Sequence, residues 1–564
     1  MPTVPPILIV VLLGVAGVLF MFNRRQRARA LREQRAAWGG ALDRERNMEA
    51  IASYYRGVAA HVAPALDDRT WDDLDMDAVF ALLDRTESAV GQQLLYSRLR
   101  ANGRASGAGP FEALVTRMSD DVAARERAQL VLRSLRASAA YDLWWLAMPG
   151  TLATERRHVL FPVAGLSMVV LVAASVFWPP ALFLLMVGAM GSILLRASVA
   201  QRLRVVTGAF RELAPLLAAA EVFVALDLPE TASSLRLDLP RLARLRSIAA
   251  WAGRDSARAV AGDMQEILFE YLNLLFWLDA NALFFGAREL GRRGSELLRV
   301  IAAVGDVDAA ISIASYRAGT SGWTRPTFRS RTVILDAARH PLLPHAVPNS
   351  VAMTAPEGMI VTGSNMSGKT TFLRTVGVTA VLAQTINTCL AVRYEAPEFV
   401  VRSCIGRADD LQSGKSYYFA EVESVVSIVR SARGSASHLL LFDELFRGTN
   451  TVERIAAAEA VLLSLLAPAT GEPTAHVVLA ATHDGELVTL LEGVYGAYHF
   501  ADAIGPAGLS FDYLLRPGAA RTRNAIALIA QQGAPAALIE HARERARQLE
   551  EARTVALDEL GRQA

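Results

Sequence analysis

A glycine-rich stretch in the second half of the chain has the residue types and spacing of a phosphate-binding loop. It fits the pattern G-x-x-x-x-G-K-[ST], between an apolar run that suits a buried strand and a proline-free, helix-forming run. Glycines let backbone N–H groups close on phosphate oxygens, and the start of the following helix favours negative charge. The stretch comprises Gly363, Ser364, Asn365, Met366, Ser367, Gly368, Lys369, Thr370 and Thr371. It predicts an ATP site in which Lys369 contacts the β and γ phosphates and the Thr370 hydroxyl binds Mg²⁺.

Two carboxylates follow another apolar run further along the chain. Leu439 to Phe442 reads as a buried strand, and Asp443 and Glu444 come directly after it. ATP hydrolysis needs a metal that neutralises phosphate charge and a group that orients the attacking water. We therefore predict that Asp443 binds Mg²⁺ and that Glu444 polarises the water. An ordinary acidic pair at a strand end is the alternative, and the phosphate loop upstream argues against it.

Two further polar positions are candidates for the same site. His483 follows a buried run at 477–481 and is placed to contact the γ-phosphate or the attacking water. A histidine at a strand end usually has only a structural role, so this assignment depends on the two motifs above. A small polar segment before a predicted helix contains Ser413, Gly414, Lys415 and Ser416. Such a helix N-terminus can complete a phosphate site on a neighbouring subunit, but the same residues also fit a simple N-cap.

The elements that must position these residues change character along the chain. Residues 31–146 and 205–318 have mostly helical apolar spacing, whereas from Thr332 onward short β-like runs alternate with glycine turns and helices. We predict a mostly α-helical region followed by an α/β P-loop ATPase domain. Two cysteines, and nine histidines without metal-ligand spacing, predict neither a disulfide framework nor structural zinc. The net charge of +2 gives no overall electrostatic case for nucleic-acid binding.

Three apolar runs predict transmembrane helices in a chain that is 52% hydrophobic and 20% charged. The first, Ile7 to Phe22, is followed by arginines within residues 24–35, a flank that favours an anchor over a cleaved signal peptide. The others, at 159–177 and 181–195, are separated by a Trp-Pro-Pro turn and have basic flanks, which favours a membrane hairpin over a buried one. The positive-inside rule then predicts an inner (cytoplasmic) membrane location, with the N-terminus outside, the ATPase domain in the cytoplasm and the lipid bilayer as a partner.

Taken together, these motifs resemble the MutS family of ATPases, relatives of the ABC class. The resemblance is strong over roughly residues 330–550 and weaker over the helical parts of 40–330. It includes the phosphate loop, the acidic strand end and the histidine turn. Further similar stretches are Leu82-Leu83-Asp84-Arg85-Thr86, Arg339-His340-Pro341-Leu342, Pro348-Asn349, 409–421, 443–450, 481–487 and 524–545.

The resemblance implies a homodimer with composite ATP sites. Each site would join the phosphate loop of one subunit to the segment 413–416 of the other, and residues near the C-terminus would form a helical dimerisation element. It also implies a nucleotide contact at Asn349. Ala346 stands where the family has an aromatic ring that stacks on adenine, so Tyr513 is proposed to supply the ring. No domain precedes the helical core to carry the family's mismatch-reading Phe-x-Glu motif, and the tripeptide at 210–212, which fits the letters, lies in a helical stretch.

We expect six segments along the chain. They are an N-terminal anchor at 1–22, a helical core and lever region at 23–158, a membrane hairpin at 159–195, a second helical region at 196–330, a MutS-like ATPase domain at 331–520 and a dimerisation element at 521–564. The favoured function is a membrane-anchored, Mg²⁺-dependent ATPase that couples hydrolysis to lever motion and acts on DNA or on a protein partner that the sequence does not identify. One alternative is an ATP-switched DNA-binding protein related to mismatch repair. The other is an ABC-type transport component, which the absence of charges within the spans disfavours.

Overall fold

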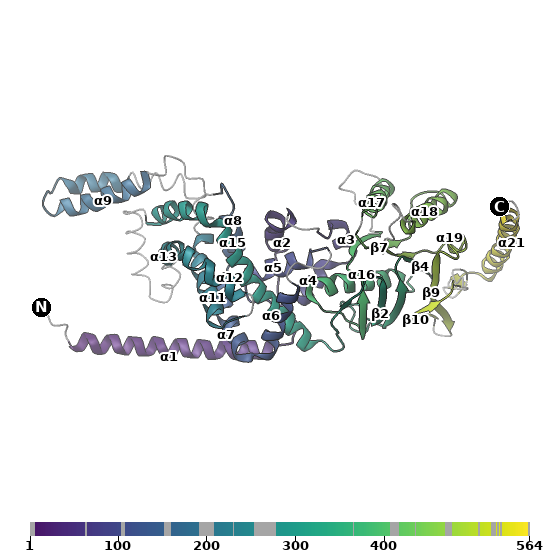
Figure 1. Cartoon of the computed structure of the whole chain (residues 1–564), viewed down its shortest axis with the longest axis horizontal. Helices are drawn as coiled ribbons and strands as arrows, with labels where there is room; N and C mark the ends of the chain where they lie inside the picture. The colour runs from purple at the N-terminus through teal and green to yellow at the C-terminus, as the bar shows by residue number, and fades with distance from the viewer. Residues whose placement is uncertain are drawn as a thin grey trace. The chain divides into compact units, whose positions relative to one another are not determined.

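The computed structural model of the chain divides into two compact units (Figure 1). One unit comprises residues 1–65, 77–101 and 105–321, and the other comprises 66–76, 102–104 and 322–564. The residues that the structure describes are 6–61, 65–102, 108–151, 160–190, 208–228, 231–252, 278–364, 366–406, 417–434, 436–467, 476–505, 508–520, 526, 529–530 and 533–561.

The first unit is helical, and its longest element, α15, packs against many of the others. Asn47, Ser88 and Asp121 begin α2, α5 and α7 by accepting a hydrogen bond from the backbone N–H three residues further on. The helix α15 has 42 residues, is kinked at Arg293 and contacts α5, α6, α11, α12 and α13. The helices are α1 (Pro6–Ala37), α2 (Met48–Gly57), η1 (Ala59–His61), α4 (Met76–Leu83), α5 (Ala89–Leu99), α6 (Ala108–Asp120), α7 (Val122–Leu132), η2 (Arg133–Leu135), η3 (Ser138–Asp142), α8 (Leu143–Leu146), α9 (Leu160–Ser175), α11 (Leu213–Ala225), α12 (Thr231–Asp238), η5 (Pro240–Leu242), α13 (Ala243–Ala252) and α15 (Leu278–Gly319).

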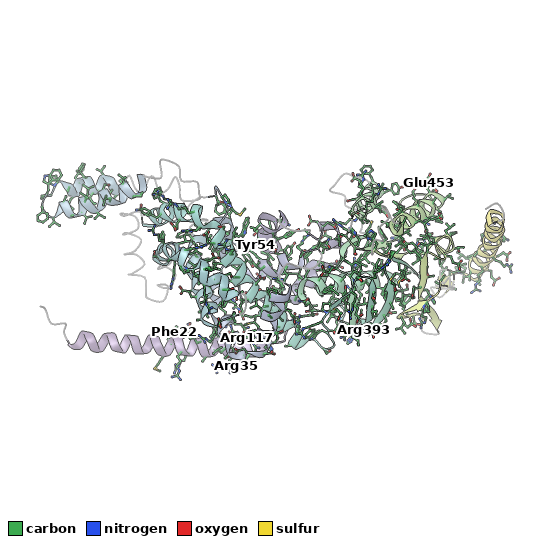
Figure 2. The ribbon with its side chains drawn as sticks, viewed as in Figure 1. Phe22, Arg35, Tyr54, Arg117, Arg393 and Glu453 are labelled. Atoms are coloured by element: carbon green, nitrogen blue, oxygen red, sulfur yellow. The ribbon has the colours of Figure 1, made fainter. Side chains whose placement is uncertain are left out.

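The C-terminal part of α1 lies against α7 and the turn after it. Arg35, labelled in Figure 2, has its Nε 2.6 Å from a Glu126 carboxylate oxygen, and Arg133 lies 3.1 Å from Glu33. The arginine-rich segment is therefore part of a helix whose end is tied to its own unit. Because the Arg35 and Glu33 side chains are exposed, neither pair is expected to contribute much to the stability of the fold.

The prediction of membrane-spanning helices is wrong for the part of the chain that the structure describes, where no helix is long and apolar enough to cross a membrane. The helix α9 has 16 residues, fewer than the roughly 20 that a span needs. The helix α1 joins the first apolar run to the arginine-rich segment in one element ending at Ala37. Residues 191–195 of the third predicted span lie outside the described ranges. The predicted anchor, hairpin, membrane location, sidedness and bilayer partner are corrected accordingly.

A buried carboxylate joins α15 to the start of α5. Asp308 is fully buried and accepts hydrogen bonds from the backbone N–H groups of Glu87 (2.9 Å) and Ser88 (2.7 Å) and from the Ser88 hydroxyl (2.6 Å). Burial raises the pKa of Asp308 to about 7, although the three donated bonds favour the ionised form. This carboxylate therefore satisfies backbone donors at the helix start that have no partner within α5 itself.

Replacing Asp308 with asparagine is expected to destabilise the chain by about 2–3 kcal/mol, because the amide NH₂ would face N–H donors that then lack an acceptor. Chemical denaturation monitored by circular dichroism measures this loss. Asp306→Asn is the matched control. Asp306 is on the same helix, is 30% exposed and pairs with Arg98 at 2.8 Å. Its loss should cost less than about 1 kcal/mol. Equal effects of the two substitutions would contradict the special role of Asp308.

The second unit is built on two β-sheets. The larger has the strand order β10-β9-β4-β8-β7-β6, in which β10 is antiparallel to β9 and the other neighbours are parallel. The smaller has the order β1-β5-β2-β3. The strands are β1 (Thr327–Phe328), β2 (Thr332–Ala338), β3 (Asn349–Thr354), β4 (Glu357–Thr362), β5 (Arg393–Ala396), β6 (Val400–Ile405), β7 (His438–Asp443), β8 (Val477–Ala481), β9 (Tyr495–Gly505) and β10 (Gly508–Pro517).

Helices cover both faces of the larger sheet. Leu440 and Phe442 of β7 point into a core shared with α17 (Tyr417–Ser431), α18 (Thr451–Leu466) and α19 (Gly485–Leu490). Leu441 points the other way, because side chains alternate along a strand, and lies against Gly377 of α16 (Lys369–Ile386). A further α-helix of this unit is α21 (Ala536–Gly561). A helical region followed by an α/β region confirms the predicted order of structural classes.

A short helix from early in the chain belongs to the second unit. The helix α3 (Asp68–Asp73) lies along β6 at the edge of the larger sheet. Thr70 Oγ1 accepts a hydrogen bond from the backbone N–H of Ser403 (3.1 Å), and the Asp73 carboxylate accepts from the Ser403 hydroxyl (2.8 Å) and from Ile405 N–H (2.9 Å). Side chains of α3 thus cap donors that an edge strand otherwise leaves unpaired.

Candidate ATP-binding site

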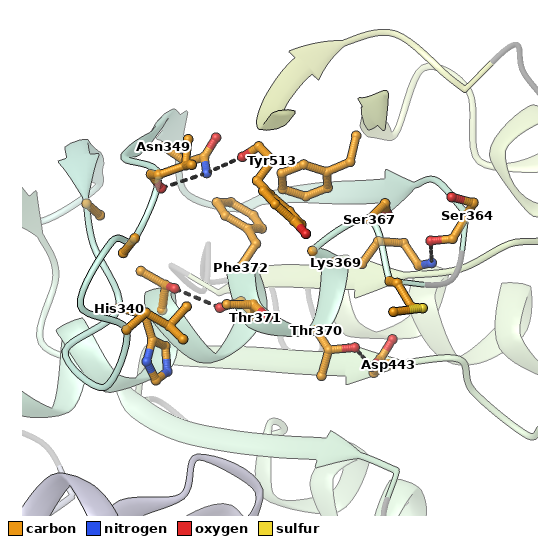
Figure 3. A pocket seen from close by; sticks show the side chains of 18 of the residues that line it. His340, Asn349, Ser364, Ser367, Lys369, Thr370, Thr371, Phe372, Asp443 and Tyr513 are labelled. Atoms are coloured by element: carbon orange, nitrogen blue, oxygen red, sulfur yellow. Dashed lines mark hydrogen bonds between the residues drawn. The ribbon is translucent and has the colours of Figure 1, made fainter. Parts of the chain in front are cut away.

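The glycine-rich loop lies at the carboxyl end of β4, where α16 begins (Figure 3). Gly363 has a φ of 145° and Gly368 a φ of 107°, in the region that side chains disfavour. A Cβ on Gly363 would also lie only 3.0 Å from the Phe500 carbonyl oxygen. Both glycines of the pattern are therefore required by the turn. Asn365, between these two glycines, lies outside the described residues.

Lys369 is the first residue of α16 and folds back over the loop. Its Nζ donates hydrogen bonds to the carbonyl oxygens of Gly363 (2.8 Å) and Ser364 (3.0 Å). The residue is buried, and burial lowers the pKa of Lys369, while the carboxylates of Glu444 and Asp443 oppose this shift. The two hydrogen-bond acceptors of this buried ammonium are neutral carbonyl oxygens. Charged phosphate oxygens would bind it more strongly.

Thr370 and Asp443 meet across the edge of the sheet. The Thr370 hydroxyl donates a hydrogen bond of 2.6 Å to Asp443 Oδ2. Strand register explains the meeting, because Asp443 pairs with Ala481 of β8, which pairs with Val361 just before the loop. Burial raises the pKa of Asp443, and the bond from Thr370 opposes that shift. A hydroxyl and a carboxylate at this distance are a donor set that fits Mg²⁺, which prefers oxygen ligands.

Glu444 and His483 face each other beside this pair. His483 Nδ1 lies 3.4 Å from Glu444 Oε1, and Arg447 pairs with Glu444 Oε2 at 2.5 Å. The contact with His483 lowers the pKa of Glu444 and raises the pKa of His483. Glu444 also has a φ of 53°, a backbone conformation that costs about 1–3 kcal/mol and is commonly retained at functional sites. The structure brings together the acid and the histidine that the sequence analysis placed in separate motifs.

A second pair of predicted residues borders the other end of the cavity. The Asn349 side chain donates to the Tyr513 carbonyl oxygen (3.0 Å) and accepts from the backbone N–H of Leu515 (2.7 Å). The Tyr513 ring lies close to the phosphate loop, since a Cβ on Gly368 would be 3.3 Å from its Cδ1. Asn349 therefore holds the strand segment that carries Tyr513 against the cavity (Figure 3).

The cavity between these groups has a volume of about 730 Å³. Its lining includes Asn349, Ser364, Lys369, Thr370, Asp443, Glu444 and Tyr513. The lining residues that the sequence analysis did not assign to the site include His340, Phe372 and Arg447. Arg447 follows Glu444 by three residues and pairs with it across a turn. The sequence shows this spacing, but only the structure shows the turn that brings the two side chains together. The predicted segment Ser413, Gly414, Lys415 and Ser416 lies outside the described residues.

Comparisons with known proteins agree with this geometry. Residues 359–550 match the family model for MutS domain V. The chain is 35% identical over 268 residues to the DNA mismatch repair protein MutS of Thermus thermophilus, which is 46% of this chain and 31% of that protein. It is 32% identical over 250 residues to the DNA mismatch repair protein MutS of Natronomonas pharaonis, covering 43% and 28%. The chain thus spans less than a third of the length of these relatives. The family match and the relatives support a MutS-family ATPase domain in this chain.

Proposed function

We propose that the chain is a Mg²⁺-dependent ATPase whose phosphate-binding residues are those of the loop at 363–371. The main support is the 2.6 Å hydrogen bond between Thr370 and Asp443, which lie 73 residues apart in the sequence. Both residues line one cavity together with Lys369 and Glu444. Mg²⁺ bound between Thr370 and Asp443 would neutralise charge on the β and γ phosphates. Steady-state phosphate release from ATP, with and without Mg²⁺, tests the proposal.

In this proposal the protein side chains have distinct roles. Lys369 exchanges its two carbonyl acceptors for phosphate oxygens, and the loop's backbone N–H groups hold the same oxygens. Glu444 is ionised and orients a water for in-line attack, while His483 holds the carboxylate and contacts the γ-phosphate. The trans role of residues 413–416, the dimerisation role of 521–564 and the coupling of hydrolysis to the helical region rest on the family resemblance.

Tyr513 is proposed to stack on the adenine ring. Replacing it with alanine is expected to weaken ATP binding about 5- to 20-fold, because an aromatic stacking contact contributes about 1–2 kcal/mol. Binding of inorganic tripolyphosphate, which has no base, should be unchanged when both ligands are measured by calorimetry. Tyr513→Phe keeps the ring and is the matched control. An equal loss for both ligands would place the effect in the loop rather than at the base.

A second candidate function is ATP-switched DNA binding, because the relatives are named DNA mismatch repair proteins. Nucleic-acid binding would appear as DNA-stimulated ATP hydrolysis and as an affinity that falls steeply with salt. Titration of the full chain with duplex and branched DNA at low and moderate salt measures both. The absence of both effects would leave a protein partner as the target of the ATPase. The transport alternative requires membrane-spanning helices, and none is found in the described part of the chain.

A further inference from the structure

An ion pair next to His483, formed by Arg454 and Asp484, has no role in the site as described so far. Arg454, in the first turn of α18, donates from Nη2 to Asp484 Oδ1 (2.7 Å) and from Nε to Asp484 Oδ2 (3.1 Å). The two side chains are only 14% and 12% exposed. A two-bond, largely buried pair of this kind fixes the orientation of both groups, unlike a single exposed contact.

Because it binds Arg454, the Asp484 carboxylate does not cap the helix that follows it. Asp484 is the N-cap residue of α19, but its side chain makes no capping hydrogen bond. An aspartate at this position normally accepts from the first turn of its helix, which is worth about 1 kcal/mol. Here both carboxylate oxygens point to Arg454 instead, so the local conformation gives up a cap in favour of the link to α18.

The strand ends on both sides of the turn that carries His483 are fixed by hydrogen bonds, and Asp484 N–H donates to the Thr482 hydroxyl (3.0 Å). Glu444 N–H donates to the Ala481 carbonyl (2.9 Å) and Thr482 N–H donates to the Val361 carbonyl (3.0 Å), which fixes the strand ends on both sides. At the other end, the Asn450 side chain caps α18 by accepting from Glu453 N–H (3.0 Å). Arg454 therefore lies in the capped first turn of α18.

We propose that the Arg454–Asp484 pair sets the position of His483 relative to Glu444, which makes Arg454 a positioning residue of the proposed ATPase reaction. The contact between His483 and Glu444 is 3.4 Å, longer than a good charged hydrogen bond, so a small displacement of the turn decides whether it closes or is lost. The pair links α18, through Arg454, to Asp484, the residue that follows His483. This inference rests on the proposed ATP hydrolysis and adds a residue that does not itself touch ATP.

The test is a double-mutant cycle in the full chain. Arg454→Met keeps the length of the side chain and removes the link, and we expect kcat to fall about 10- to 100-fold with the Kd for ATP within twofold of wild type. In the double variant with His483→Ala, kcat should be no lower than with His483→Ala alone, because both changes disable the same contact. Exchanging the two charges in Arg454→Asp with Asp484→Arg should restore part of the rate.

Two further measurements keep the outcomes distinct. Asp484→Asn preserves size and should reproduce the kcat loss, and Arg393→Met, which breaks an exposed pair with Glu395 on the smaller sheet, is the matched control. If the wild-type chain hydrolyses ATP and Arg454→Met does so equally well, the inference is overturned and the proposed function stands. Additive losses in the cycle, or a loss of ATP affinity in Arg454→Met, would also overturn it. If the wild-type chain hydrolyses no ATP, the proposed function itself is wrong.

Discussion

Replacing Glu444 with glutamine is expected to lower kcat for ATP hydrolysis by about 10²- to 10⁴-fold while ATP still binds, because the amide cannot orient water as the carboxylate does. The side chain keeps its size and its place at the end of β7. The ion pair with Arg447 and the contact with His483 both need the negative charge, so they should weaken. Single-turnover hydrolysis and equilibrium binding of a fluorescent ATP analogue measure the two quantities separately. ATP should remain bound and uncleaved, and the family resemblance predicts that a closed dimer accumulates.

Glu453→Gln is the matched control for this substitution. Glu453, labelled in Figure 2, is exposed on the first turn of α18 and accepts a hydrogen bond from the Thr449 hydroxyl. Removing its charge should change kcat by less than about twofold, since an exposed contact of this kind contributes little. Normal turnover by Glu444→Gln would remove Glu444 from the reaction. A comparable loss in Glu453→Gln would show that charge in this region matters in general.

Replacing Lys369 with methionine is expected to abolish detectable ATP binding. The methionine side chain fits the buried space of the lysine stem but leaves the phosphates without their main cation. Wild type should be stabilised by about 2.7 kcal/mol when Mg²⁺-ATP is present at 100 times its Kd, and Lys369→Met should gain nothing at the same concentration. Thermal unfolding followed with increasing Mg²⁺-ATP measures the difference. In the absence of nucleotide, the variant should unfold at or above the wild-type temperature, because it buries no ammonium.

Arg374→Met provides the comparison on the same helix. Arg374 lies one and a half turns further along α16 and pairs with Asp75 at 2.5 Å, away from the cavity lining. This variant should retain the full ATP-dependent stabilisation. A wild-type shift with ATP in Lys369→Met would mean that nucleotide binds elsewhere. Loss of the shift in both variants would point to a general disturbance of α16.

The part of the site that could be predicted from the sequence consists of groups whose positions follow from local backbone rules. Parallel strands end at one edge of a sheet, so a glycine-rich loop after one strand and an acidic pair after another are expected to meet. The Thr370–Asp443 bond is the outcome of that rule. The contacts of Arg447, Arg454 and Asp484 depend on how turns and helices cross, which residue spacing does not encode.

The membrane prediction failed for a related reason. Apolar composition reports how much a segment avoids water, whereas a span also requires a helix of sufficient length. The helix α9 ends at Ser175, and the apolar run at the N-terminus continues into a charged helix. Hydropathy alone therefore did not predict where α9 ends or that α1 continues to Ala37.

The position of α3 determines how this protein can be divided. The chain passes between the two units at residues 65/66, 76/77, 101/102, 104/105 and 321/322. A gene fragment that begins at residue 322 would contain every strand of the ATPase unit but would lack Thr70 and Asp73, leaving the donors of Ser403 and Ile405 exposed at an open sheet edge. It would also lack Leu74, which fills the space over Gly377 of α16. Asn102, which accepts a hydrogen bond from Val401 N–H (2.8 Å) on the same strand, would also be missing. A protein truncated or fused at residue 322 is therefore expected to aggregate unless residues 66–76 and Asn102 are supplied with it.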